Sequence, residues 1–580
     1  MFNSFICSEF ISLICLVVHI TSVATTNNVV ADTKQGKVKG VRQEVEVDNK
    51  QKKIVYKFLG VPYAQKPIGD LRFKPPQALS ARRSSDYEAT SLPLICIQAN
   101  HYFDSIKGAW PEFDPTKDMS EDCLYLNIYT PSIKSCKKKY PVIFYIHGGS
   151  YFAGTPTRDI SPGEYLPTRD VVLVTIQYRL GPFGFFTTGD SEAPGNVGLL
   201  DQVEALKWVQ QNIEGFCGDK NSVTLLGESA GGSSVGLHYL SPLSRGLFHR
   251  GIAVSGVEFS PFAFKPKSTV LEASNNLIEK VNCRKQSLRE TVGCLKSIPS
   301  ATVFENSIYW LMQPFVDQHF LPDDPKTLRK EGRFQKLPLM SGFTSQDASF
   351  VIETSVTGNY STPKLREFLD DHFQRFIGYA KEEAKDAYNA LVAKYELNVE
   401  DTSELRQNLI DMLSDYYMKA PTHAVLSFHS DKGASTFMFE FAYRSKLHPK
   451  PEWMGVVHED TTAYKFGLPL LNSKTGLKFD KRDQKVSDVV VTMFTNFAKF
   501  GNPTPIPVRG AKWDPFDSSK KAYLKIRKNP VMKNNYRPRR MNFWNSEFPS
   551  LLPKGSKKEH ISSGDAVKKR GKPNFEPLLW

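Results

Sequence analysis

The sequence lacks any hydrophobic run of about 18 residues, the shortest length that predicts a membrane-spanning helix. Its clearest apolar stretch, Phe10 to Ile20, is too short to cross a bilayer comfortably. Internal repeats are absent, and the C-terminal residues lack the hydrophobic tail of a lipid-anchor signal. The first and the last of these absences argue against a transmembrane or lipid-anchored protein.

Residues 1–24 instead resemble a secretory signal peptide, because the small residues Ser22 and Ala24 follow the apolar run. No Lys or Arg precedes Phe10, although such signals usually begin with positive charge. A buried amphipathic start to the domain is the alternative. We expect a secreted, extracellular protein.

Cysteine is also scarce, with eight in 580 residues and none after Cys294. Two of them leave with the predicted signal, and the remaining six allow 15 connectivities, among which spacing does not choose. One sequon, Asn359-Tyr360-Ser361, predicts glycosylation at Asn359.

Acidic residues are rare only near the C-terminus. The formal net charge is +14, and Lys520 to Lys572 holds 16 basic residues against 3 acidic ones. The rest of the chain is therefore close to neutral. We expect residues 550–580 to form a basic, disordered tail. Its cations favour weak binding to acidic glycans or an anionic membrane face, and a merely solvated or trimmed tail is the alternative.

The stretch Val223 to Gly236, VTLLGESAGGSSVG, contains the strongest chemical signal. A short apolar strand leads into Gly227-Glu228-Ser229-Ala230-Gly231, and small, helix-compatible residues follow. A serine on such a strand–turn–helix has strained backbone geometry and an exposed hydroxyl. We predict that Ser229 is a catalytic nucleophile.

Strands and helices alternate around this turn. Apolar strands are expected at 141–146, 171–180 and 223–226, with an amphipathic helix at 198–213 before the last of them. Further strands are expected at 251–255, 337–340 and 436–441, and a long helix at 483–500. This order predicts an α/β fold with a large, mostly parallel central sheet flanked by helices, over residues 25–549.

Oxyanion donors are expected where His147-Gly148-Gly149-Ser150 leaves the buried strand 141–146. Glycines there leave backbone N–H groups free to approach a tetrahedral intermediate. We assign the N–H groups of Gly149, Ser150 and Ala230 as donors, with Gly148 shaping the loop. The pattern calls for no cofactor and no metal.

The acid and base of a triad follow the serine in this order of elements. His458 stands in a loop with a glycine before it and carboxylates after it, so it is a candidate base among twelve histidines. Asp347 lies in a polar loop that leaves a buried strand, where a triad acid belongs. Asp460 is the alternative acid.

Four segments together resemble the type-B carboxylesterases of the α/β-hydrolase fold, and the resemblance runs from about Val38 to Pro549. They are GESAGGSSVGLHYLSPLSRGLFHRGIAVSG, EDCLYLNIYTP, YIHGGSYFAGT and FTNFAKFGNPTP. The likeness implies that His458 is the base, since Gly455 to Asp460 matches G-x-x-H-x-D/E-D. It also implies that Asp347 is the acid, five residues after Gly342, where the family usually has Glu.

The same resemblance implies two disulfides, Cys96–Cys123 and Cys283–Cys294, and leaves Cys136 and Cys217 either paired or reduced. Phe113 takes the place of the tryptophan that holds choline in cholinesterases, which disfavours choline esters because Phe is a weaker cation–π partner. The resemblance implies that Phe113 and Glu228 line the substrate gorge. Glu228 replaces the Gln that is usual in juvenile hormone esterases. Insect secreted esterases, including venom carboxylesterases, look most similar.

The resemblance therefore predicts a secreted serine hydrolase of neutral or lipophilic esters, with a small-molecule substrate and no nucleic-acid partner. The alternative is a cholinesterase-like adhesion or binding protein that keeps the fold without turnover. Such proteins typically lose the serine or histidine and carry a membrane anchor, whereas Ser229 and His458 are present here.

Overall fold

The computed structural model describes residues 28–47, 51–79, 84–99, 114–134, 136–156, 161–356, 360–471 and 478–553. Four sequence predictions lie outside these residues: the signal peptide 1–24, the gorge residue Phe113, the sequon residue Asn359 and the tail beyond Pro553. No helix in the described ranges is long and apolar enough to cross a membrane.

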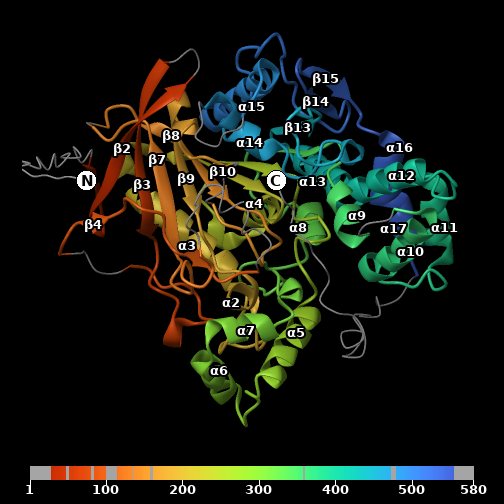
Figure 1. The fold of residues 1–580 in the computed structure, drawn as a ribbon, viewed down its shortest axis with the longest axis horizontal. Helices are drawn as coiled ribbons and strands as arrows, with labels where there is room; N and C mark the ends of the chain where they lie inside the picture. Colours follow the sequence, from red (N-terminus) through yellow and green to blue (C-terminus); the bar gives the residue numbers. More distant parts are fainter. Residues whose placement is uncertain are drawn as a thin grey trace, which may run out of the picture.

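One sheet of 13 strands organises the molecule (Figure 1). Its seven central strands run parallel to their neighbours, in the order β9 (Val172–Ile176), β8 (Tyr140–Ile146), β10 (Gly218–Glu228), β11 (Arg250–Val254), β12 (Leu339–Thr344), β13 (Thr436–Phe441) and β14 (Ala522–Ile526). The predicted mostly parallel sheet is confirmed in this central part.

Antiparallel strands extend both ends of the sheet. On one side lie β1 (Asn28–Thr33), β2 (Gly36–Val47), β3 (Gln51–Pro62) and β7 (Tyr125–Thr130), and the short strand β4 (Tyr87–Glu88) pairs with β2 in parallel. On the other side β15 (Val531–Asn534) pairs with β14. A separate two-stranded sheet joins β5 (Ile95–Cys96) to β6 (Met119–Ser120).

Both faces of the central strands are buried, which explains why these strands are apolar without alternation. In β8, Phe144 and Ile146 belong to one core cluster, while Ile143 and Tyr145 belong to a second. The first cluster includes α3 (Val197–Asn212) and α4 (Ala230–Leu240), and the second includes α15 (Lys481–Phe500). Helices therefore cover the sheet on both sides.

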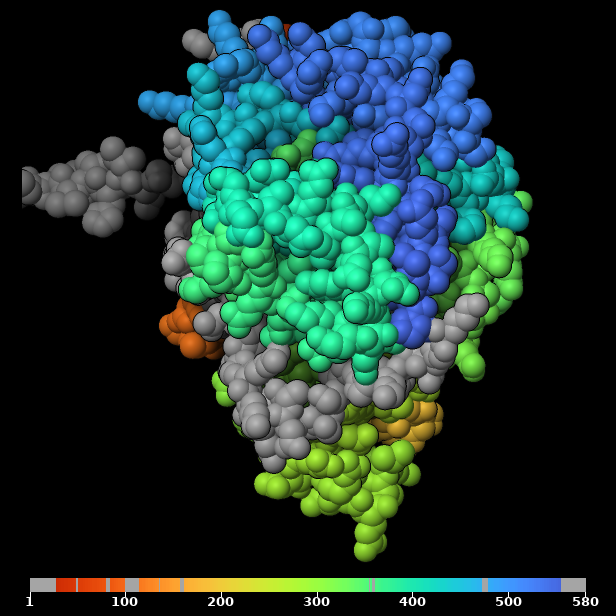
Figure 2. All heavy atoms as spheres, turned by 90° about the vertical axis from the view of Figure 1, so that its right-hand side faces the viewer, coloured from red at the N-terminus to blue at the C-terminus, as the bar shows by residue number. Residues whose placement is uncertain are grey.

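Further helices pack around this three-layered centre. They are α2 (Gly181–Phe185), α5 (Lys267–Lys280), α6 (Leu288–Ser297), α7 (Ser300–Asn306), α8 (Pro325–Glu331), α9 (Ser349–Ser355), α10 (Thr362–His372), α11 (Lys385–Lys394), α12 (Thr402–Ser414), α13 (Ala420–Asp431), α14 (Thr461–Lys465), α16 (Pro538–Asn542) and α17 (Phe548–Leu551). Figure 2 shows the C-terminal helices, in blue, beside the helices of residues 360–415, and α17 contacts α11.

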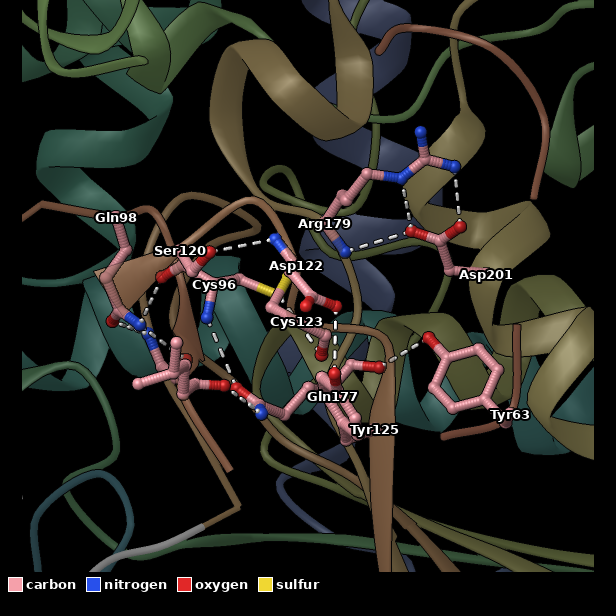
Figure 3. The surroundings of a disulfide bond; sticks show 12 residues. Tyr63, Cys96, Gln98, Ser120, Asp122, Cys123, Tyr125, Gln177, Arg179 and Asp201 are labelled. Atoms are coloured by element: carbon pink, nitrogen blue, oxygen red, sulfur yellow. Dashed lines mark hydrogen bonds and ion pairs between the residues drawn. A yellow bond between two sulfur atoms is a disulfide. The ribbon is translucent and has the colours of Figure 1, made fainter. Parts of the chain in front are cut away.

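Three disulfides join the six cysteines that follow the predicted signal. Cys96–Cys123 and Cys283–Cys294 confirm the two predicted pairs, and Cys136–Cys217 resolves the pair that the sequence left open. Figure 3 shows the surroundings of the first bridge. There the side-chain oxygen of Gln177 accepts the backbone N–H of Cys96 at 3.2 Å, which fastens the disulfide loop to the end of β9.

Candidate active site

Ser229 lies at the turn between β10 and α4, as predicted, with φ 58° and ψ −123°. A non-glycine residue at this positive φ is strained, and the surrounding structure must hold it there. The flanking glycines leave no room for larger residues. A Cβ on Gly227 would lie 2.1 Å from the Gly231 oxygen, and one on Gly231 would lie 2.1 Å from the Ile146 oxygen. The G-x-S-x-G spacing is therefore a packing requirement of this turn.

His458 contacts Asp347 directly, because its Nδ1 lies 2.6 Å from the Asp347 Oδ1. The second carboxylate oxygen of Asp347 accepts the Ser255 hydroxyl at 2.7 Å and the Thr344 N–H at 2.8 Å. Asp347 is fully buried. These bonds fix the carboxylate so that only one oxygen faces the histidine.

The shorter side chain of aspartate reaches the imidazole because the two loops are joined by hydrogen bonds. The N–H of Gln346 donates to the Val456 oxygen at 3.0 Å, and the Gln346 side-chain oxygen accepts the Val456 N–H at 3.0 Å. Gln346 directly precedes Asp347, and Val456 stands two residues before His458. This pairing draws the acid loop toward the histidine loop.

The charge around His458 favours its protonated form. Burial alone lowers the pKa of this imidazole, but the hydrogen bond and charge of Asp347, with the charges of Glu459 and Glu228, outweigh it. The pKa of His458 is therefore raised above its ordinary value. This is the environment that a general base with a stabilised imidazolium requires.

Asp460, the alternative acid, is occupied elsewhere. Its Oδ1 lies 2.9 Å from His448 Nε2, and its Oδ2 accepts the Val457 N–H at 2.7 Å. Burial raises the pKa of Asp460 to about 6. Asp460 therefore stabilises the backbone of the histidine loop, whereas Asp347 contacts the imidazole of His458.

The glycine-rich loop after β8 lies against the serine turn. A Cβ on Gly148 would lie 3.0 Å from the Ser229 Cβ, so the two backbones touch. Gly149 has φ 108° and Ser150 has φ 54°. The Gly149 oxygen accepts the N–H groups of Phe152 and Ala153 at 3.1 and 3.0 Å, which closes the loop in a tight turn. Ala230 begins α4 on the other side of Ser229.

Aromatic side chains stand beside this loop. The Phe350 ring lies 5.1 Å from the His458 ring, measured between centroids. Phe152, two residues after Ser150, lies 5.2 Å from Tyr309, which stacks on Phe304 at 4.8 Å. Aromatic rings therefore form part of the surroundings of the site.

Glu228, predicted to line the substrate gorge, is only 1% exposed. Its carboxylate forms an ion pair with Lys465 of α14, and it accepts the hydroxyls of Thr461 and Thr462 at 3.2 and 3.3 Å. Sequence analysis missed Lys465. Its place in the apolar stretch Ala463 to Leu471 was the available signal, because an unpaired lysine is rarely buried.

A family model described as "Carboxylesterase family" matches residues 27–544. Human Neuroligin-2 is 32% identical to this chain, over 90% of the chain and 68% of that protein, and Neuroligin-2 of Mus musculus and of Rattus norvegicus match equally. These relatives are mammalian neuroligins, so the expected likeness to insect esterases is not found among them. The family match and the mostly parallel sheet flanked by helices show an α/β-hydrolase. The chain belongs to the carboxylesterase family.

Proposed function

We propose that this protein is a secreted serine carboxylic-ester hydrolase with Ser229, His458 and Asp347 as its triad. The observation that carries the proposal is the 2.6 Å contact between His458 and Asp347, in a loop bound to the strained turn of Ser229. A serine needs an adjacent base to become a nucleophile, and the base needs an acid that fixes its tautomer and orientation.

Each residue has one task in the proposed reaction. His458 removes the proton of Ser229, whose oxygen attacks the ester carbonyl, while Asp347 stabilises the imidazolium. The N–H groups of Gly149, Ser150 and Ala230 are the proposed donors to the oxyanion. His458 then protonates the leaving alcohol, and water releases the acid from the acyl-enzyme by the same steps in reverse.

The preference for neutral or lipophilic esters follows from charge and packing. The charges of Asp347, Glu459 and Glu228 act on the imidazole of His458, and Lys465, a buried cation beside the nucleophile turn, is already bound to Glu228 and is not free to bind an anionic substrate. The rings of Phe152, Phe350 and their neighbours offer apolar contact instead. Secretion is supported by the three disulfides, which persist in oxidising compartments.

The second candidate is a protein of this fold that binds a partner and does not turn over esters. The specific observation in its favour is that the three curated relatives carry the name Neuroligin-2 and not the name of an esterase. Taken alone, the comparisons favour this alternative over ester hydrolysis. The contact between His458 and Asp347 and the strained turn of Ser229 favour hydrolysis, so an activity measurement separates the two candidates.

The test compares the purified protein with its Ser229→Ala variant on p-nitrophenyl butyrate. We expect the variant to lose on the order of 10³ or more in kcat while its melting temperature stays unchanged. A fluorophosphonate probe should add to the Ser229 peptide of the wild type and to no peptide of the variant. Equal background rates and no probe adduct would support the binding-protein alternative.

A further inference from the structure

The hairpin formed by β14 and β15 carries an unusual excess of positive charge. Residues 520–540 contain nine Lys and Arg, and no Asp or Glu stands between Asp517 and Glu547. β15 is the last strand in the order of the large sheet, so this hairpin forms one of its ends. The structure describes this segment throughout.

Three of these cations are paired with acids of the protein body. Lys525 lies 3.1 Å from Glu440, and both Arg537 and Arg540 bind Asp411, at 3.0 and 2.7 Å. These ion pairs anchor the hairpin and the start of α16 to the core. They leave the other six cations of the segment without a described acidic partner.

The six remaining cations are at least partly exposed and lie within 20 residues of one another in sequence, and we call them together the hairpin surface. It consists of Lys520, Lys521, Arg527, Lys528, Lys533 and Arg539. All are exposed except Lys521, which is half-buried. Among the described residues, none of the six forms an ion pair with an acidic side chain. The nearest acid in sequence, Asp517, accepts the backbone N–H groups of Ser519 and Lys520 at 2.9 and 2.7 Å.

Protection of a sheet edge does not account for this surface. Lysines on edge strands commonly block pairing with other chains, and Lys533 on β15 fits that role. Arg527 and Lys528, however, lie in the turn between the strands, Lys520 and Lys521 precede β14, and Arg539 lies in α16. The cations are also spread along the hairpin, because at roughly 3.3 Å per residue the chain from Lys521 to Arg527 is about 20 Å long.

We infer that the hairpin surface binds a linear sulfated polysaccharide. Extended, unpaired Lys and Arg match a linear polyanion, whose bound counterions they would release. This inference does not depend on the proposed ester hydrolysis, because none of these residues belongs to the site of Ser229.

Two features distinguish this partner from other polyanions. None of the exposed large hydrophobic residues in the described chain lies between 520 and 540, so no apolar side chain is placed to enter a membrane. The aromatic residues of the segment, Tyr523 and Tyr536, are buried against each other with ring centroids 5.1 Å apart. They offer no exposed platform on which the bases of a single-stranded nucleic acid would stack.

The test measures retention of the full chain on a heparin column across a salt gradient. The variant carries Arg527→Gln, Lys528→Gln and Lys533→Gln. We expect it to elute at lower salt and to bind a heparin oligosaccharide about tenfold more weakly. The slope of log Kd against log salt should fall by roughly one for each cation that contacts the polysaccharide.

The matched control carries Lys280→Gln, Lys285→Gln and Arg289→Gln. These three residues are exposed and lie in the α5–α6 region, which Figure 1 places below the sheet and away from β14 and β15. The control changes net charge by the same amount, and both variants should keep the wild-type melting temperature. Equal elution shifts for the two variants would mean that only net charge matters and would overturn the inference.

Two further outcomes would also overturn it. An unchanged elution position of the hairpin variant would place any heparin binding elsewhere on the chain. Binding to phosphatidylserine vesicles that the hairpin variant loses, without any affinity of the wild type for heparin, would identify a membrane as the partner of the hairpin surface.

Discussion

The carboxylate of Glu228, directly before Ser229, forms a buried ion pair with the ammonium of Lys465, at the end of the short helix that follows His458. Neither side chain is more than 1% exposed. Thr461 and Thr462, in the same helix, donate their hydroxyls to this carboxylate. The ion pair therefore ties the turn of the proposed nucleophile to the loop of the proposed base. It fixes the relative position of two segments that are far apart in the sequence.

Replacing Lys465 with Met should destabilise the protein by about 3–5 kcal/mol, because it leaves a buried carboxylate without its counter-charge. The lone carboxyl of Glu228 should then remain protonated in the folded state up to a higher pH than in the unfolded chain. Because the folded variant then binds a proton more tightly than the unfolded chain, its free energy of unfolding falls as the pH rises toward the raised pKa. The difference in stability between variant and wild type should therefore be larger at pH 7 than at pH 5. Urea unfolding at both pH values measures this difference.

The double variant Glu228→Gln with Lys465→Met is the control for this prediction. It removes both charges, and we expect it to recover part of the lost stability because no lone charge stays buried. If the single Lys465→Met variant were as stable as the wild type, the ion pair between Glu228 and Lys465 would not stabilise the fold.

The pH dependence of kcat/KM should follow His458. Activity requires the neutral imidazole, so the rate should fall as the pH drops through its pKa. Because Asp347 raises that pKa above its ordinary value, this acid limb should lie above about 6.5. Replacing Asp347 with Asn removes the charge that raises the pKa and should move the limb to lower pH. An acid limb at or below the ordinary imidazole value of about 6.5 in the wild type would contradict the assignment.

The sequence predicts the nucleophile turn well because its signal is local. The apolar strand, the two glycines and the small residues of α4 all occur within residues 223–236. The identity of the acid is less determined by local pattern, because it depends on which loop meets His458 in space. The bonds between Gln346 and Val456 make that contact, and nothing in either segment alone predicts them.

Two other features show the same limit. The strand predicted at 171–180 ends at Ile176, directly before Gln177, whose side chain bonds to the backbone of Cys96 and Leu94. The Cys136–Cys217 bridge forms because one cysteine precedes β8 and the other directly precedes its neighbour β10. Strand order carries this information, and cysteine spacing does not.

The two candidate acids can be separated by paired substitutions. Asp347→Asn should leave the protein folded but lower kcat by on the order of 10³ to 10⁴, since it favours the wrong tautomer of His458. Asp460→Asn should cost less activity and more stability, because Asp460 bonds His448 and the Val457 N–H and makes no described contact with the His458 ring. Steady-state kinetics with thermal unfolding measures both effects. Wild-type turnover in Asp347→Asn alongside a crippled Asp460→Asn would reverse the assignment.

The Cys136–Cys217 bridge should stabilise the start of the central sheet without affecting chemistry. It closes a loop with a sequence separation of 81, and the backbone N–H of Tyr140 also bonds to the Cys217 oxygen at 2.8 Å. Replacing both cysteines with Ser should cost about 4.5 kcal/mol, mainly through the greater freedom of the unfolded chain. The matched control replaces Cys283 and Cys294, whose separation of 11 predicts a smaller loss of about 3 kcal/mol. Denaturant unfolding measures both, and kcat of each folded variant should stay close to that of the wild type because no triad residue contacts either bridge. A larger loss from the shorter loop would contradict the loop-entropy account.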